Sequence, residues 1–227
     1  MPAHIYGRRC GMNAINKLAK DYNLSVIEDS AEAHGTPLDS DIACFSLFGN
    51  KIITAGEGGI CVTNSEKLSW QIRHLSSMAF DEVHNFVHKK IAYNYRMTNM
   101  QGAVALAQLE RMDEFLSKRE QIEKWYNEGL TGLRQITIMP KRHSVWYYDL
   151  LAERRDRLMD FLELQGIETR MYFKPMSMQP MYFDANYTKL KAWEYAQKGL
   201  YLPTYFSLTK NDVDYIIQVI RQFYSSV

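Results

Sequence analysis

The chain has 227 residues, 46% of them hydrophobic and 23% charged, and its 27 lysines and arginines nearly balance 26 aspartates and glutamates. A chain of this length and composition can bury one large core or two modest ones, so it is globular and not disordered. The net charge of +1 provides no general field for nucleic acid or a membrane surface, so we expect neither as a partner.

The cysteines and histidines do not indicate a metal site. Cys10, Cys44 and Cys61 are odd in number and scattered, and the last two lie in strands predicted to be buried, which argues against a disulfide framework as well. His84 and His88 have helical ligand spacing, but no third ligand is evident nearby. No apolar run approaches a membrane span and no basic-then-apolar leader is present, so we expect a soluble, cytoplasmic protein.

The first half of the chain predicts an αβ unit of a parallel sheet. Helical spacing of apolar residues predicts a helix over residues 11–22, followed by a strand over 24–28. The apolar face of this helix consists of Met12, Ile15, Ala19 and Tyr22. A buried strand is predicted over 42–48 and another over 59–63, and a helix over 65–77 begins at a cap supplied by Asn64 or Ser65.

The second half predicts a long helix and then a smaller α+β domain. Residues 98–130 should form one helix that leaves a large domain, residues 1–130, and enters a small one, residues 131–227. Residues 80–90 are irregular and charged, and we interpret them as a surface loop near a dimer seam. Within the small domain we expect strands near residue 136, over 145–151 and over 167–173, and helices over 153–165, 188–198 and 210–224.

One lysine lies where covalent chemistry is favoured. Lys51 follows the predicted strand 42–48 in a glycine-rich segment, and the preceding strand ends on the acids Glu28 and Asp29. The ends of neighbouring parallel strands share the crevice in which open α/β sheets bind ligands. Pyridoxal phosphate chemistry needs an amine for the cofactor aldehyde and a carboxylate that keeps the ring nitrogen protonated. Spacing alone leaves open a solvated lysine and a helix-capping acid.

Several motifs in register resemble one known family. The DegT/DnrJ/EryC1/StrS aminotransferases carry similar landmarks in the same order, and here these read HIYG (4–7), VIEDSAEAHG (26–35), CFSLFGNKIITAGEGG (44–59), AYNYRMTNMQGAVALAQLERMDEF (92–115) and GIETRMYFKP (166–175). The resemblance implies an α/β fold of the aspartate aminotransferase-like fold type I, with a truncated large domain around a parallel-type sheet and a smaller α+β C-terminal domain. It also implies a pyridoxal phosphate enzyme that aminates a nucleotide-linked keto sugar, with glutamate as the amine donor.

The resemblance assigns roles to five residues. Lys51 matches the Schiff-base lysine, and Asp29 matches the acid paired with the ring nitrogen. Glu32 matches the residue near the cofactor's phenolic oxygen, and Ser46 matches a serine that bonds the phosphate. Asn94 matches an asparagine that reaches the phosphate in the neighbouring subunit, which implies a homodimer with composite sites. Structural alternatives remain open, because Ser46 suits a strand core, Glu32 the first turn of a helix and Asn94 a loop.

The residue type at Lys51 also separates activities within the family. Relatives with histidine at this position catalyse dehydration, so lysine argues for transamination, with Lys51 as the general base once the incoming amine displaces it. The wording NYRMTNMQGA and QLERMDEF resembles the branch that makes GDP-perosamine from GDP-4-keto-6-deoxymannose.

The chain departs from the family in three places. It begins just before HIYG, so we expect it to lack the N-terminal portion that carries a phosphate-binding Gly-Thr turn, and we expect the isolated chain to bind pyridoxal phosphate poorly. The loop between His34 and Ile42 is short, and Ser177 stands where many relatives have histidine. A non-catalytic partner that donates Asn94 to another subunit, or a split enzyme that needs a complementary chain, therefore remains an alternative.

Overall fold

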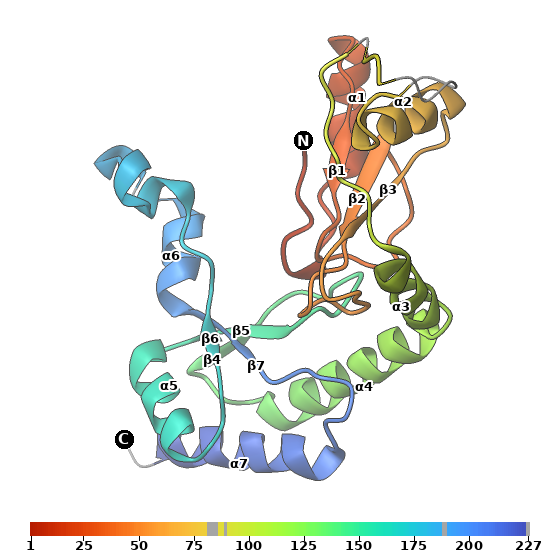
Figure 1. The fold of residues 1–227 in the computed structure, drawn as a ribbon. Helices are drawn as coiled ribbons and strands as arrows, with labels where there is room; N and C mark the ends of the chain where they lie inside the picture. Colours follow the sequence, from red (N-terminus) through yellow and green to blue (C-terminus); the bar gives the residue numbers. More distant parts are fainter. Residues whose placement is uncertain (81–85, 89, 188–189, 226–227) are drawn as a thin grey trace. The chain divides into compact units, whose positions relative to one another are not determined.

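The computed structural model describes residues 1–80, 86–88, 90–187 and 190–225, and the chain forms two compact units. Unit 1 comprises Met1–Leu116 with Arg142–Ser144, and unit 2 comprises the remaining residues from Ser117 onward. The division falls within helix α4 (Met112–Leu130) (Figure 1), whereas the predicted domain boundary lies at the C-terminal end of the same helix.

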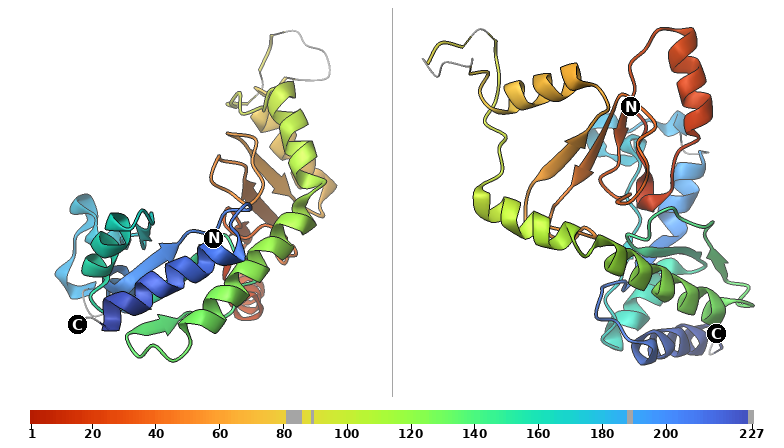
Figure 2. Two further views of the ribbon diagram at one scale, coloured as in Figure 1. Left: turned by 90° about the horizontal axis from the view of Figure 1, so that it is seen from below. Right: turned by 90° about the vertical axis from the view of Figure 1, so that its right-hand side faces the viewer.

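Unit 1 is built on a sheet of three strands in the order β1-β2-β3. Strands β1 (Ile27–Asp29) and β2 (Ile42–Ser46) are parallel, whereas β3 (Gly59–Val62) is antiparallel to β2. The expected parallel pairing therefore holds for the first two strands, and the third makes the sheet mixed. The right-hand view of Figure 2 shows α1 (Met12–Asp21) and α2 (Glu66–Ser76) on either side of these strands.

The helix α1 and the strand β1 differ from their predictions in detail. Met12 and Ala19 are buried together with Val26, as the predicted apolar face requires, but Tyr22 is exposed because the helix ends at Asp21. The strand starts at Ile27 and not at residue 24, because Asn23 turns the chain with a φ of 50° and the Asp41 carboxylate accepts the Val26 N–H.

The predicted single helix over residues 98–130 is wrong, because the structure has two helices there. Helix α3 (Asn99–Leu109) begins in a capping box between Thr98 and Gln101, and α4 starts only at Met112. At the break, Arg111 N–H bonds the carbonyl of Gln108 at 3.2 Å, three residues back, which tightens the turn and interrupts the α-helical ladder. Helix α2 has its predicted start, since Ser65 Oγ accepts the Leu68 N–H at 3.3 Å.

Unit 2 is an α+β unit around a four-stranded antiparallel sheet of order β4-β5-β7-β6. Its elements are α4, β4 (Ile136–Ile138), β5 (Tyr148–Ala152), α5 (Arg155–Leu164), β6 (Arg170–Met171), three short 3₁₀ helices (Met176–Met178, Pro180–Tyr182 and Ala185–Tyr187), α6 (Lys191–Lys198), β7 (Gly199–Leu202) and α7 (Lys210–Ser225). The predicted helix over 188–198 begins at Lys191 in the described residues, and residues 188 and 189 lie outside them.

Strand β7 is absent from the sequence prediction, although it pairs with both β5 and β6. It follows α6 without a connecting loop, and its four residues, GLYL, are too few for a periodic signal. The predicted strand over 167–173 shrinks to two residues, and that over 145–151 begins three residues later at Tyr148.

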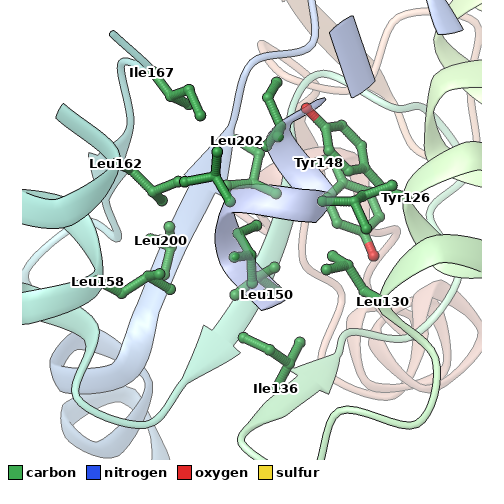
Figure 3. Close-up of a cluster of buried hydrophobic side chains, with 14 of the residues drawn as sticks. Tyr126, Leu130, Ile136, Tyr148, Leu150, Leu158, Leu162, Ile167, Leu200 and Leu202 are labelled. Carbon is green, nitrogen blue, oxygen red and sulfur yellow. The ribbon is translucent and has the colours of Figure 1, made fainter. Parts of the chain in front are cut away.

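The core of unit 2 is a single apolar cluster (Figure 3). Tyr126 and Leu130 of α4, Leu158 and Leu162 of α5, and Leu150 of β5 are almost completely buried in it. Each such side chain contributes about 2 kcal/mol to the free energy of folding through the apolar surface removed from water.

Among the described residues, no helix combines the length and the apolar composition that crossing a bilayer requires.

Candidate active site

The candidate site lies at the ends of the two parallel strands of unit 1. Asp29 is the last residue of β1, and Ser46 is the last residue of β2. Asp29 is in register with Cys44, which precedes Ser46 by two residues in β2. Residues paired in register share a sheet face, and side chains alternate along a strand, so Asp29, Cys44 and Ser46 all project from the same face.

Lys51 lies in the loop after β2, at the strand end where the sequence places it. Its backbone N–H bonds the carbonyl of Phe48 at 3.0 Å, which closes the turn, and the next two residues, Ile52 and Ile53, are buried. The Lys51 side chain is only 10% exposed, and its Nζ lies 3.9 Å from Oε1 of Glu32. The structure therefore brings Lys51 and Glu32 together away from bulk water.

The environment of Lys51 lowers the pKa of its amine below the ordinary lysine value. Burial is the largest influence and favours the neutral form, whereas the carboxylates of Glu32 and Asp29 favour the charged form and only partly oppose it. A lysine whose pKa is lowered by burial exposes its amine lone pair more readily near neutral pH, which is the property a nucleophilic lysine needs.

Glu32 is fixed by a backbone contact from far away in the sequence. Its Oε2 accepts the Tyr6 N–H at 2.7 Å. Tyr6 and Gly7 both adopt left-handed backbone conformations, with φ values of 54° and 73°. The Gly7 carbonyl in turn accepts the N–H groups of His143 and Ser144. The sequence analysis quotes HIYG as a landmark but does not predict this contact, for which the only local signal is a glycine after an aromatic residue.

The two acids that end β1, Glu28 and Asp29, have different surroundings. Glu28 is fully buried, its Oε2 lies 2.7 Å from His4 Nε2, and its Oε1 accepts the Asp39 N–H at 2.9 Å. Burial tends to raise the pKa of Glu28, but hydrogen bonds from Ser40, Asp39 and His4 outweigh it, so the pKa falls below its ordinary value. Glu28 is thus a structural anchor, and Asp29 remains at the site.

The His4 tautomer follows from its two contacts. Nδ1 accepts the Cys10 N–H at 3.2 Å, so it carries no hydrogen, and the Nε2 hydrogen points to Glu28. A neutral imidazole therefore donates to a carboxylate in this buried pair, which ties the start of the chain to β1.

Ser46 lies at the same strand end as Asp29, whereas the contacts of Asn94 are with residues outside the predicted site. Ser46 Oγ accepts the Phe48 N–H at 3.2 Å, at the same strand end as Asp29. Asn94 is exposed; its backbone forms an isolated bridge with Ser77, and its Oδ1 accepts from Arg96 Nε at 3.1 Å. Neither of these contacts is with another predicted site residue.

The donor set fits the cofactor that the resemblance implies. Pyridoxal phosphate presents an aldehyde, a ring nitrogen, a phenolic oxygen and a phosphate, and these call for an amine, a carboxylate, a further polar group and a hydroxyl. Lys51, Asp29, Glu32 and Ser46 supply those four groups around one strand end. The predicted helical pair of histidines contributes nothing testable, because His84 lies outside the described residues and His88 Nδ1 bonds the carbonyl of Met78.

Comparison with known proteins identifies the relatives of this chain. Residues 1–221 match the DegT/DnrJ/EryC1/StrS aminotransferase family. The chain is 40% identical over 240 residues to GDP-perosamine synthase of Caulobacter vibrioides, in an alignment that covers 98% of this chain and 65% of that protein. The corresponding enzyme of Escherichia coli O157:H7 is 39% identical over 237 residues, with coverages of 99% and 65%. The chain thus spans 65% of the length of these curated relatives.

Solved structures agree with the fold. The chain resembles S. venezuelae DesV with a TM-score of 0.89 and 28% identity, covering 99% of this chain and 64% of that one. Helicobacter pylori PseC, an aminotransferase involved in the biosynthesis of pseudoaminic acid, gives a TM-score of 0.90 at 23% identity, with coverages of 99% and 66%, and supports the fold alone. These likenesses confirm the predicted α/β fold of the fold-type-I class.

Proposed function

The chain belongs to the DegT/DnrJ/EryC1/StrS aminotransferase family, and we propose from this premise that it takes part in pyridoxal phosphate-dependent amination of a nucleotide-linked keto sugar. The observation that carries the proposal is the nearly buried Lys51 amine beside the Glu32 carboxylate at a strand end. An amine in these surroundings combines nucleophilicity with the ability to carry a proton.

Each predicted site residue receives a role in this proposal. Lys51 holds the cofactor aldehyde, Asp29 keeps the ring nitrogen protonated and Glu32 approaches the phenolic oxygen. Ser46 donates its hydroxyl to the phosphate, and Asn94 reaches the phosphate of a second subunit in a homodimer or with a partner chain. Because the Asn94 side chain is exposed, it is available for a contact with a second subunit.

When bound, the cofactor would supply an electron sink for the pair released at the substrate carbon. The chain's own residues position and move protons around that chemistry. The Lys51 amine, once displaced, would move a proton at Nζ between the substrate carbon that carries the amino group and the former aldehyde carbon of the cofactor. The Tyr6 N–H holds Glu32 Oε2 in place, so Oε1 stays directed toward Lys51 throughout. The net transfer moves an amino group from glutamate to the keto sugar.

The substrate we favour is GDP-4-keto-6-deoxymannose, which would give GDP-perosamine. The identity of 40% to the Caulobacter enzyme supports this choice. The lysine at position 51 supports transamination over the dehydration carried out by relatives with histidine there. We place the reaction in the cytoplasm, where nucleotide sugars and glutamate are available.

The alternative function is that of a non-catalytic or split-enzyme component that needs a complementary chain. The chain spans 65% of the length of the Caulobacter GDP-perosamine synthase. Activity with glutamate and the keto sugar, measured for the chain alone and with a candidate complementary chain, separates the two functions. Activity that arises only in the mixture supports the split enzyme.

The cofactor assignment has a sharper test. The chain is incubated with graded pyridoxal phosphate, reduced with borohydride and digested with trypsin. A reduced adduct on Lys51 blocks cleavage there and joins residues 21–51 and 52–67 into one labelled peptide. We expect this peptide at lower cofactor concentrations than labelling at exposed lysines such as Lys17. Uniform labelling of all lysines, or preferential labelling of a lysine other than Lys51, would refute the site.

A further inference from the structure

Two cysteine side chains face each other on the sheet of unit 1. Cys44 of β2 and Cys61 of β3 are in antiparallel register, and their Sγ atoms are 3.7 Å apart. Directly opposed residues of an antiparallel pair have Cα atoms about 4.5–5.5 Å apart, which lies inside the span that a disulfide bridges, about 4.4–6.8 Å. To form a disulfide, the two sulfur atoms therefore need only to approach each other, and the strands can stay in place.

The pair is accessible, and the third cysteine is separate from it. The burial predicted for their two strands is wrong at these positions, because Cys61 is exposed and Cys44 is partly exposed. Cys10 lies beyond the 3₁₀ turn of residues 5–7 and points its thiol at the carbonyl of Ala3. All three are free thiols in the structure.

We propose that Cys44 and Cys61 form a redox-active dithiol that closes reversibly to a cross-strand disulfide. Its site is the sheet face from which Asp29 and Ser46 project, because Cys44 is in register with Asp29 and two residues from Ser46. The bond would lie one strand away from the carboxylate. Disulfides of this kind in reducing compartments are transient and regulatory and are not structural staples.

The chemistry balances with a disulfide oxidant such as oxidised glutathione. The Cys61 thiolate attacks one glutathione sulfur, forming a mixed disulfide and releasing glutathione as a thiolate that takes up the proton lost by Cys61. Cys44 then loses its proton and attacks the Cys61 sulfur, which releases the second glutathione. The protein dithiol is oxidised by two electrons, and the glutathione disulfide is reduced to two thiols.

The order of these steps follows from the surroundings of each thiol. Burial, then the neighbouring Cys61 and Asp29, raise the pKa of Cys44 to about 11. The thiolate of Cys44 is therefore scarce near neutral pH, and the exposed Cys61 reacts first. Within the mixed disulfide the second step is intramolecular, which compensates for the small thiolate fraction of Cys44.

Peptide mapping tests the proposal on the full chain without any cofactor, so its outcome is independent of the proposed function. The native chain is exposed to oxidised glutathione, its remaining thiols are alkylated, and trypsin is applied without reductant. The three cysteines fall in separate tryptic peptides, residues 10–17, 21–51 and 52–67. We expect the second and third peptides to be joined, the first to be alkylated, and dithiothreitol to separate the joined pair.

Variants provide matched controls. Cys10→Ser should retain the link, and Cys61→Ser should abolish it while leaving Cys44 largely alkylated. Before oxidation, limiting alkylating agent should modify Cys61 ahead of Cys44. A link that involves Cys10, stable glutathione adducts without a Cys44–Cys61 bond, or a link only between separate chains would each overturn the proposal.

Discussion

The Nζ atom of Lys51 lies 3.9 Å from Oε1 of Glu32, and the two side chains keep only 10% and 11% of their surface exposed. The other Glu32 oxygen is bound to the Tyr6 backbone, so the carboxylate cannot turn away without losing a hydrogen bond. A charge fixed in this way acts on the amine continuously, whereas exposed surface pairs are loosened by solvent and salt.

Glu32→Gln should therefore lower the pKa of Lys51 further. Burial already lowers this pKa and the Glu32 carboxylate opposes it, so removal of the carboxylate charge leaves burial less opposed. Competitive acylation of lysines across a pH series, read by mass spectrometry, should place the reactivity midpoint of Lys51 at lower pH than in the parent chain. Glu57→Gln, in the same loop but exposed, is the control and should leave the midpoint in place. An unchanged midpoint in the Glu32 variant would show that the pair does not interact.

Glu28→Gln should destabilise unit 1 and change its response to acid. The pKa of Glu28 is lowered in the folded chain, so its stabilisation is present above the unfolded value of 4.5 and is lost as pH falls through the lower folded value. The amide cannot accept from both His4 and Asp39 as the carboxylate does, which costs about 2 kcal/mol in unfolding free energy near neutral pH. Urea unfolding should show this loss, together with a smaller stability decrease below pH 4.5 than in the parent chain. Asp21→Asn, at an exposed position, should reproduce neither effect.

Gly7→Ala should disrupt the turn that holds Glu32. A Cβ atom at Gly7 would lie 1.7 Å from the Ser144 carbonyl oxygen, and the residue has a φ of 73°. The clash and the left-handed backbone angle each cost about 1–3 kcal/mol, so the free energy of unfolding of the variant should fall by a few kcal/mol. The environment of Lys51 should be disrupted as well. Gly11→Ala is the matched control, because a Cβ there meets no atom within 4 Å. Equal stability of the two variants would contradict the close approach.

Local sequence patterns are sufficient for the elements that carry the candidate site. The apolar strand before Gly49, the acid pair that ends β1 and the Ser65 cap each depend on neighbouring residues, and the structure contains all three features. The same patterns cannot reveal that Tyr6 holds Glu32, because those residues are 26 positions apart and the donor is a backbone group common to most residues. The break before Met112 also escapes detection, since helix-favouring residues continue through it and one tightened turn decides the end of α3.

The Cys44–Cys61 link and the cofactor proposal predict a combined effect. If Asp29 holds the cofactor ring, a disulfide that involves the residue in register with it should alter that carboxylate's surroundings. Borohydride capture of pyridoxal phosphate on Lys51 should then decrease in the oxidised chain and recover with dithiothreitol. Cys61→Ser should show no dependence on oxidant, whereas Cys10→Ser should behave like the parent chain. Equal capture in oxidised and reduced parent chain would show that the link does not affect the site.

The composite site proposed for Asn94 can be tested by complementation between two defective chains. Lys51→Ala lacks the amine but retains Asn94, and Asn94→Ala retains the amine but lacks the side chain that reaches across. Each alone should capture little pyridoxal phosphate at residue 51, whereas a mixture refolded together should restore labelling on the Asn94→Ala chain, since some dimers contain one complete site. A hydrogen bond to a charged phosphate contributes about 1.5–3 kcal/mol to the binding free energy. The single Asn94 variant should therefore need at least roughly tenfold more cofactor than the parent chain for the same labelling. Asn50→Ala, in the loop beside Lys51, is the control and should gain nothing from mixing with the Lys51 variant. If mixing leaves the Asn94→Ala chain as poorly labelled as before, Asn94 acts within its own chain or not at all.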